Sequence, residues 1–171
     1  MTRSAAAKTH HKKAVSKTQG RRIIAVTNSA IHGRGVVAVK AIAAGQRIIE
    51  YKGERIGWPE ALRRHPHDPA QSFHTFYFTV DDDTVIDGNV AGNTSRWINH
   101  SCAPNCEADL VDVRGTQRVF ISALHDIAPG EELSYDYGLT LDERYTQKLK
   151  KQFECRCGQP KCRGTMLAPK R

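Results

Sequence analysis

The segment 96–106 gathers polar side chains that could bind a ligand. It reads Arg-Trp-Ile-Asn-His-Ser-Cys-Ala-Pro-Asn-Cys, with Asn99, His100 and Cys102 at its centre. Such side chains hydrogen-bond to nearby backbone groups and so disfavour the interior of a helix or strand. The segment is therefore either a surface loop or a buried polar segment that holds a ligand.

Three of the five cysteines lie close together as Cys155-x-Cys157-x4-Cys162. Because the cysteine count is odd and residues 1–19 lack the apolar stretch of a secretory signal, this cluster favours metal binding over disulfides. Tetrahedral structural zinc takes four thiolate or imidazole ligands. The cluster supplies three of them, in a segment too short to build its own core. Three unrelated reduced cysteines are the alternative.

Two further segments stand out. Residues 131–138 read Glu-Glu-Leu-Ser-Tyr-Asp-Tyr-Gly, and residues 31–35 read Ile-His-Gly-Arg-Gly. A single Gly-x-Gly is weak evidence, because it is usually only a tight turn. The order and combination of all these segments carry more information than any one of them.

Short β-like runs punctuated by glycine must position these segments. The pattern predicts strands at 34–40, 47–52, 75–80, 84–87 and 118–123. Residues 59–64 could form one helical turn, and Thr140 followed by Glu143 has the spacing of a capping box that opens a helix through about Lys151. Many short strands with little helix predict a β-rich single domain with a cysteine-rich appendage.

The net charge of +8 is unevenly distributed along the chain. Residues 1–22 carry +7 and residues 143–171 carry +7, whereas residues 23–142 carry −6. An acidic body suits a cationic peptide partner better than nucleic acid, which we expect to bind only weakly, through the basic ends. No apolar stretch reaches the roughly 20 residues that span a bilayer, so we expect an intracellular protein without a membrane partner.

Four segments in this order, 31–35, 45–54, 96–106 and 126–138, resemble the SET domain of protein lysine methyltransferases. The C-terminal Cys-x-Cys-Gly-x3-Cys-Arg-Gly resembles that family's post-SET element. The resemblance implies a mainly β, β-clip-like SET fold with a knot-like core, few short helices and a zinc-bound C-terminal segment. In that core the Asn99 segment would pass through a loop closed near Tyr137.

Composition and the resemblance together predict a division of the chain. Residues 1–20 are rich in Ala, Lys, Thr and His without periodicity, which predicts a basic disordered arm. The resemblance makes residues 21–139 the SET domain and residues 140–171 a C-terminal helix with the post-SET zinc segment.

The resemblance assigns functional residues. Tyr137 takes the position of the family's catalytic tyrosine, and Tyr135 that of a Phe/Tyr switch. Residues that would bind the methyl donor S-adenosylmethionine are His32, Gly33, Arg34, Gly35, Phe76, Asn99, His100 and Arg156. The ligands of a structural Zn²⁺ would be Cys102, Cys155, Cys157 and Cys162, with Cys106 as the nearest competitor for the fourth position.

Two positions depart from the family pattern. Where the family usually has Tyr-x-Phe, this chain has Phe76-Tyr77-Phe78. Strict register puts Phe76 at the tyrosine position, and strand alternation sends Tyr77 to the opposite face. Either that wall of the site lacks a hydroxyl or the strand contains a bulge. Trp97 replaces a commoner phenylalanine, and we expect it to refill the core.

The implied reaction needs a neutral lysine amine. Free lysine has a pKa near 10.4, so roughly one molecule in two thousand is deprotonated at pH 7. An aromatic channel and the positive sulfonium of the methyl donor would both disfavour the ammonium form. The Tyr137 hydroxyl would orient the amine and contact the methyl through weak CH···O interactions. Because a tyrosine at 135 leaves less room for added methyls, we expect mainly monomethylation, or dimethylation.

Two other functions remain open at this stage. A zinc-stabilised nucleic-acid-binding module would show strong, salt-dependent DNA binding, and an inactive SET domain would serve as a non-catalytic peptide reader. For the enzyme we expect a lysine-containing basic protein or peptide as substrate, with histone tails as the family's habitual one. Automethylation of the lysine-rich arm is a further hypothesis. The protein would work in the nucleus or on a chromosome in a eukaryote, and in the cytoplasm, or delivered to a host, in a bacterium.

Overall fold

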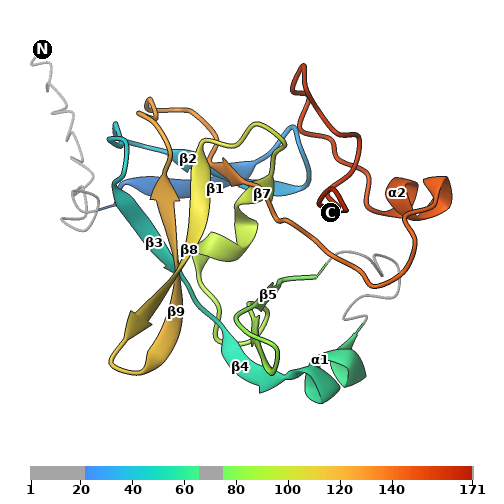
Figure 1. Ribbon diagram of the computed structural model, residues 1–171. Coiled ribbons are helices and arrows are strands. Elements are labelled where there is room, and N and C mark those ends of the chain that lie inside the picture. Colours follow the sequence, from blue (N-terminus) through green and yellow to red (C-terminus); the bar gives the residue numbers. More distant parts are fainter. Residues whose placement is uncertain (1–21, 66–74, 171) are drawn as a thin grey trace, which may run out of the picture.

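Short apolar runs separated by turns fold into strands throughout the part of the chain that the structure describes (Figure 1). The structure is a computed structural model, and it describes residues 22–65 and 75–170. The strands are β1 (Ile24–Asn28), β2 (Arg34–Ala38), β3 (Arg47–Tyr51), β4 (Glu54–Gly57), β5 (Tyr77–Thr79), β6 (Thr84–Asp87), β7 (Asn99–His100), β8 (Cys106–Val113), β9 (Thr116–Ala123) and β10 (Ser134–Tyr135). The helices are α1 (Trp58–Arg64), the 3-10 helix η3 (Thr94–Trp97) and α2 (Gln147–Gln152). The mainly β fold with few short helices is therefore confirmed.

The strands form four small sheets instead of one large one. β1 pairs with β2, β7 with β10, β3 and β8 flank β9, and β4 and β5 flank β6. The longest pairing is the β8–β9 hairpin, which projects from one side of the molecule (Figure 1). Its turn is made by Arg114 and Gly115, both at positive φ, as a tight two-residue hairpin turn requires.

The expected strands agree closely with the observed ones. All five predicted runs contain a strand, and 84–87 coincides with β6. The predicted helical turn is α1, but the capping box at Thr140 is wrong. The second helix begins only at Gln147, because the Thr146 side chain caps it by accepting a hydrogen bond from the backbone N–H of Leu149. Threonine favours the N-cap position of a helix, so both Thr140 and Thr146 could cap this one. The tertiary fold uses Thr146.

The main core lies where the sheets meet. Its fully buried side chains come from β2, β9 and the loops around them, and they include Val36, Ile42, Ile98, Ile121, Ile127 and Leu133. Ile42 and Ile127 form an isolated antiparallel bridge that ties two loops together. A second, smaller cluster forms around Tyr51, Val80 and Val119.

The shortest sheet is the most important for function. β7 and β10 pair in parallel, with Asn99 opposite Ser134 and His100 opposite Tyr135. The buried side chain of Asn105 extends this pairing, since its amide accepts from Ser134 N (2.8 Å) and donates to the Glu132 carbonyl (2.8 Å). Two polar segments separated in sequence thus lie side by side. The threading of one through a closed loop stays a prediction.

The C-terminal segment folds back beside β7 (Figure 1). Leu167 is buried, and it pairs with Leu139 through an isolated parallel bridge. The arm predicted at 1–20 lies outside the described residues, as do residues 66–74. No helix among the described residues has the length and apolar character needed to cross a membrane.

Candidate active site and metal centre

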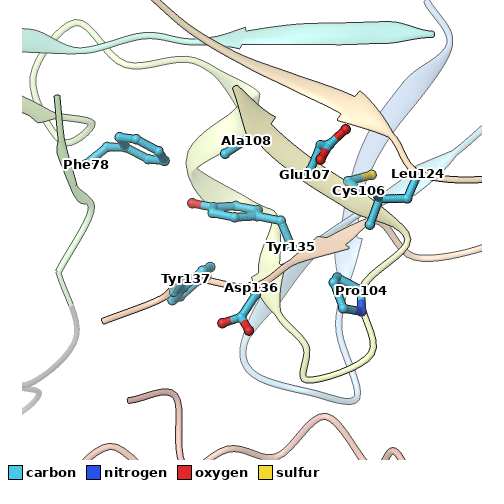
Figure 2. Close-up of a pocket in the computed structure, with 9 residues that line it drawn as sticks. All are labelled: Phe78, Pro104, Cys106, Glu107, Ala108, Leu124, Tyr135, Asp136 and Tyr137. Atoms are coloured by element: carbon cyan, nitrogen blue, oxygen red, sulfur yellow. The ribbon is translucent and has the colours of Figure 1, made fainter. Parts of the chain in front are cut away.

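Aromatic rings from β5 and from the β10 segment line a cavity beside the β7–β10 pair (Figure 2). Successive rings lie close together, with centroids 5.3 Å apart for Tyr51 and Phe78, 6.4 Å for Phe78 and Tyr135, and 4.9 Å for Tyr135 and Tyr137. The cavity measures about 350 Å³, and its other walls include Pro104 and parts of β8. Tyr51 contacts the Phe78 ring without lining the cavity itself, and nothing in the sequence pointed to this contact, because only the tertiary fold brings the two residues together.

The hydroxyls of the two β10-segment tyrosines differ in their surroundings. The Tyr137 hydroxyl donates to the Ile98 carbonyl (2.9 Å), so the lone pairs of its oxygen remain able to accept. No described residue accepts a hydrogen bond from the Tyr135 hydroxyl, although the ring is buried. Burial raises the pKa of both phenols, and the pKa of Tyr135 lies well above the ordinary value of a tyrosine. Both hydroxyls therefore stay neutral at physiological pH.

Asn99 is held by a buried polar network. Its Nδ2 lies 2.9 Å from the Arg34 carbonyl and 3.0 Å from both Ser29 Oγ and Glu132 Oε1. Ser29 Oγ in turn donates to Glu132 Oε1 at 2.7 Å. The network therefore joins β7 to the glycine turn before β2. Nothing in the sequence pointed to Ser29 or to this role of Glu132.

The neighbouring Glu131 does act as the turn cap that the Pro-Gly sequence predicts. Its Oε2 accepts a hydrogen bond from the backbone N–H of Ala128 at 3.1 Å. The two adjacent glutamates thus have different partners: Glu131 caps the turn, whereas Glu132 binds Ser29 and Asn99.

Gly35 must be glycine because of the same network. An added Cβ would lie 2.3 Å from Glu132 Oε1 and 2.9 Å from Ser29 Cβ. Gly33 has a φ of +49°, a left-handed conformation that glycine adopts without strain. The Gly-x-Gly segment therefore lets the backbone approach Asn99 closely.

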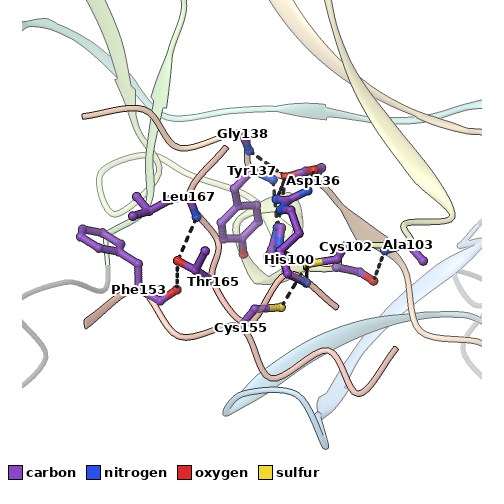
Figure 3. Close-up of polar contacts among 12 residues, drawn as sticks. His100, Cys102, Ala103, Asp136, Tyr137, Gly138, Phe153, Cys155, Thr165 and Leu167 are labelled. Carbon is purple, nitrogen blue, oxygen red and sulfur yellow. Dashed lines mark hydrogen bonds and ion pairs between the residues drawn. The ribbon is translucent and has the colours of Figure 1, made fainter. Parts of the chain in front are cut away.

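His100 links the tyrosine segment to the cysteine cluster (Figure 3). Its Nδ1 accepts the backbone N–H of Tyr137 (3.1 Å), so in a neutral ring the proton sits on Nε2, which lies 3.5 Å from Cys102 Sγ. Burial lowers the pKa of His100, against a smaller opposing effect of Asp136. The imidazole is therefore neutral, and it can donate to a thiolate at Cys102.

Phe76 and Trp97 pack together with two arginines. Their ring centroids are 5.0 Å apart in an edge-to-face arrangement, and the guanidinium carbons of Arg34 and Arg96 lie 4.9 and 4.7 Å from the Trp97 ring centroid. No carboxylate in the described part of the chain pairs with either arginine. Nε of Arg96 is buried and lacks a hydrogen-bond partner. These features make a cationic, aromatic site suited to an anionic group, and sequence analysis missed Arg96.

The departure at Phe76 has a definite structural outcome. β5 pairs with β6 in regular register, with Phe78 opposite Ile86 and no bulge. The Tyr77 hydroxyl points to the other face, where it donates to the Ala61 carbonyl of α1 (3.1 Å). Of the two alternatives, the structure therefore has the wall without that hydroxyl.

Four cysteines from distant segments form the candidate metal centre. The Sγ atoms of Cys102, Cys155, Cys157 and Cys162 all lie within 4.8 Å of one another. Cys102 Sγ is 3.7 Å from that of Cys155 and 3.9 Å from that of Cys162. Tetrahedral zinc with Zn–S bonds of about 2.3 Å needs sulfur atoms roughly 3.8 Å apart. The four thiols therefore fit a structural zinc ion.

Cys106, the competing ligand, is not part of this cluster. It is fully buried at the start of β8, and burial raises the pKa of its thiol to about 12. Backbone N–H groups instead point at the clustered sulfur atoms, with Arg163 N 3.4 Å from Cys102 Sγ and Gly164 N 3.3 Å from Cys162 Sγ. Such outer contacts orient metal ligands and stabilise thiolates.

The structure thus brings most of the sequence-assigned residues together around β7 and β10. Two of them lie at its margins. His32 is exposed, with its carbonyl 3.3 Å from Asn99 Nδ2. The Arg156 side chain is also exposed and pairs with Glu154 (3.2 Å).

Comparison with known proteins agrees with this architecture. Residues 33–138 match the family model described as SET domain. The chain is 44% identical over 137 residues to the Saccharomyces cerevisiae histone-lysine N-methyltransferase, H3 lysine-4 specific, covering 80% of this chain and 12% of that protein. It is 38% identical over 140 residues to the Drosophila virilis histone-lysine N-methyltransferase trithorax, covering 82% of this chain and 4% of that protein.

Solved structures agree as well. A structure titled ctPRC2 in an autoinhibited conformation bound to S-adenosylmethionine superposes with a TM-score of 0.64 at 30% identity, over 68% of this chain and 15% of that one. The crystal structure of Chaetomium thermophilum polycomb repressive complex 2 gives a TM-score of 0.66 at 29% identity, over 71% of this chain and 16% of that one.

A small β fold with paired polar and tyrosine segments and a four-cysteine centre defines a class of protein. The chain belongs to the SET domain family. It spans only a small fraction of the length of the relatives that it matches.

Proposed function

We propose that this SET domain transfers methyl groups from S-adenosylmethionine to the ε-amine of a lysine in a protein. One observation carries the proposal above the others. The parallel pairing of β7 and β10 places Asn99 and His100 directly beside Tyr135 and Tyr137, next to an aromatic cavity. A nucleic-acid-binding module or a peptide reader would have no need for this combination.

The donor-binding residues assigned from the sequence fit the chemistry of the donor. The molecule carries an amino group, a carboxylate and an adenine. Carbonyl groups of His32 and Arg34 converge near Asn99, and they suit the amino group. The guanidinium groups of Arg34 and Arg96 lie over the Trp97 ring, and Nε of Arg96 lacks a hydrogen-bond partner. These two groups suit the carboxylate. The backbone at Arg156 would cover the adenine.

The protein's own residues would favour the neutral form of the lysine amine and would orient that amine. When bound, S-adenosylmethionine supplies a methyl group on a positively charged sulfur, which a neutral lysine amine can accept. The rings of Phe78, Tyr135 and Tyr137 line the cavity and would disfavour the ammonium form of a lysine that enters it, since burial disfavours charge. The Tyr137 oxygen, fixed by its bond to Ile98, can orient the amine.

The four-cysteine centre would have a structural role. A zinc ion there would fasten the C-terminal segment to the loop after β7, because Cys102 belongs to that loop and the other ligands to the C-terminal segment. This arrangement supports the proposed division into a SET domain at 21–139 and a post-SET segment within 140–171.

Two related proteins are named as histone methyltransferases, and we propose a histone or another basic protein as substrate. The acidic body of the chain supports a cationic partner. Action on chromatin in a eukaryotic nucleus follows from that substrate. A bacterial setting, automethylation of the arm and weak nucleic-acid binding stay predictions.

The test is methyl transfer from labelled S-adenosylmethionine to histones by the native protein and by Tyr137→Phe. We expect Tyr137→Phe to lower the turnover number roughly 100-fold, because the amine loses its fixed acceptor. Affinity for S-adenosylhomocysteine, measured by calorimetry, should change little.

Tyr77→Phe is the matched control, because it removes a tyrosine hydroxyl on the opposite face of β5. It should leave turnover within about twofold of the native value. Native protein that transfers no label to histones, other basic proteins or itself would refute the proposal.

A further inference from the structure

Arg163 makes two contacts that no assigned role explains. It follows the metal-ligand position Cys162, and its guanidinium forms a two-pronged pair with Asp136, at 2.5 Å from Oδ2 and 2.9 Å from Oδ1. Its backbone N–H points at Cys102 Sγ, 3.4 Å away. A single residue of the C-terminal segment thus contacts both the loop after β7 and the segment after β10.

Asp136 lies between Tyr135 and Tyr137, so its position is coupled to theirs. Its Oδ1 also accepts the backbone N–H of Gly138 (3.0 Å), which fixes the turn that follows Tyr137. The His100 ring is 3.5 Å from the same oxygen, but its Nδ1 already accepts from Tyr137 N. The cation that balances Asp136 is therefore Arg163.

The pKa of Asp136 agrees with this pairing. Burial raises it, but the contacts from Arg163 and the Gly138 N–H outweigh burial, and the net pKa lies below its ordinary value. The carboxylate is therefore charged at neutral pH. A planar guanidinium that meets a carboxylate through two parallel bonds also fixes orientation, which a single contact does not.

Among the described residues, few other polar contacts join the C-terminal segment to the rest of the domain. At its far end the Ala168 N–H donates to the Leu139 carbonyl (2.8 Å). The Arg156–Glu154 pair lies within the segment itself. Across the described ranges 22–65 and 75–170, the Arg163–Asp136 pair is the ion pair that joins this segment to the tyrosine segment.

We propose that Arg163 is a positioning residue that latches the C-terminal segment onto the tyrosine segment through Asp136, and so keeps the donor site closed. The proposal rests on the proposed function, because closure matters only if the site binds S-adenosylmethionine. The cysteine centre would attach the C-terminal segment to the loop after β7. The Arg163–Asp136 pair would fix the orientation of the segment over the donor site.

The first test is hydrogen exchange of backbone amides in residues 163–168, in the metal-loaded protein without donor. We expect Arg163→Gln and Asp136→Asn each to raise exchange about fivefold, and the double variant to add little more. Arg163→Lys should recover part of the protection. Glu154→Gln, which removes the exposed pair within the segment, should leave it unchanged.

The second test separates positioning from general damage. The KM for S-adenosylmethionine should rise about fivefold in Arg163→Gln while kcat changes less than twofold, since the chemistry of Tyr137 is untouched. Zinc content should stay at one ion per chain. If Arg163→Gln loses zinc or unfolds, the same amides in the native protein provide the test, because their exchange should rise with ionic strength.

Unchanged exchange in both single variants, or in native protein at high salt, would overturn the latch. Equal losses in kcat and zinc content in Arg163→Gln and Asp136→Asn would show a structural role instead. Because the exchange measurement needs no methyl transfer, failure of the latch can be told apart from failure of the proposed function.

Discussion

At the scale of single residues, Tyr135 and Tyr137 show how two tyrosines only two positions apart acquire different properties. Both rings line the cavity with centroids 4.9 Å apart. The Tyr137 hydroxyl is committed to the Ile98 carbonyl, whereas no described residue accepts from the Tyr135 hydroxyl. The Tyr137 hydroxyl uses its hydrogen on Ile98, so toward a substrate its oxygen can only accept. The Tyr135 hydroxyl is available to hold a water or the substrate amine.

We therefore predict that Tyr135→Phe changes the product more than the rate. Removing the hydroxyl frees space beside the amine, so the ratio of dimethyl- and trimethyl-lysine to monomethyl-lysine should rise roughly tenfold. Mass spectrometry of a histone peptide at several time points would measure it. Tyr77→Phe should leave the ratio unchanged, and efficient trimethylation by the native protein would show that Tyr135 does not limit the product.

At the scale of elements, the Gly-x-Gly turn and β7 are built around a shared carboxylate. Glu132 occupies the space that a side chain at Gly35 would need, and it holds Ser29 and Asn99. The turn, the β7 strand and the β10 segment thus depend on one another. A change in any of them should alter binding of the methyl donor.

Gly35→Ala is predicted to weaken both folding and donor binding. Its Cβ would meet Glu132 Oε1 at 2.3 Å, and relieving the clash should cost about 1–3 kcal/mol of stability. Urea denaturation and calorimetry with S-adenosylhomocysteine would measure the two effects. Gly115→Ala in the β8–β9 turn is the control, because it strains a φ of +79° without meeting any atom. It should lower stability alone.

The cysteine centre gives a second prediction at this scale. Chelation should release one zinc ion per chain and expose four thiols to a thiol reagent, because the four sulfur atoms share one centre. Cys106 should stay unreactive until the chain unfolds, since it is buried and its pKa is raised to about 12. Thiol titration with and without denaturant would count them. Five equally reactive thiols after chelation would argue against the assignment of Cys106.

At the scale of the whole molecule, ion pairs join neighbouring strands within a sheet and fasten a helix to a sheet. Arg64 of α1 pairs with Glu54 of β4 (2.7 Å) and with the fully buried Asp87 of β6 (3.1 Å). Arg118 of β9 holds Glu50 of β3 through two contacts. The acidic body is therefore partly neutralised from within.

These contacts predict how stability depends on pH. Hydrogen bonds from Arg118 lower the pKa of Glu50 below its ordinary value, against a smaller effect of burial. Because the folded pKa is depressed, the pair stabilises the protein above the unfolded pKa of about 4.3, and this stability is lost as pH falls through the folded pKa.

Glu50→Gln should therefore lower stability by about 1 kcal/mol at pH 6 and by much less at pH 3.5. Thermal unfolding of both proteins at a series of pH values would measure the difference. A difference that stays constant across this range would show that the pair contributes nothing through charge.

The sequence by itself determined the family, most strands, the tyrosine segments and three clustered cysteines, since each depends on local order and residue type. It misplaced the start of the second helix, because Thr140 has the spacing of a capping box, whereas the helix is capped by Thr146, which has Leu149 and no Glu or Gln three residues later. Only the tertiary structure decided that Tyr51 packs against Phe78 and Arg96 against Trp97, that Glu132 binds Asn99, and that Arg163 pairs with Asp136. Such contacts join residues far apart in the chain, and their formation depends on packing that no local pattern records.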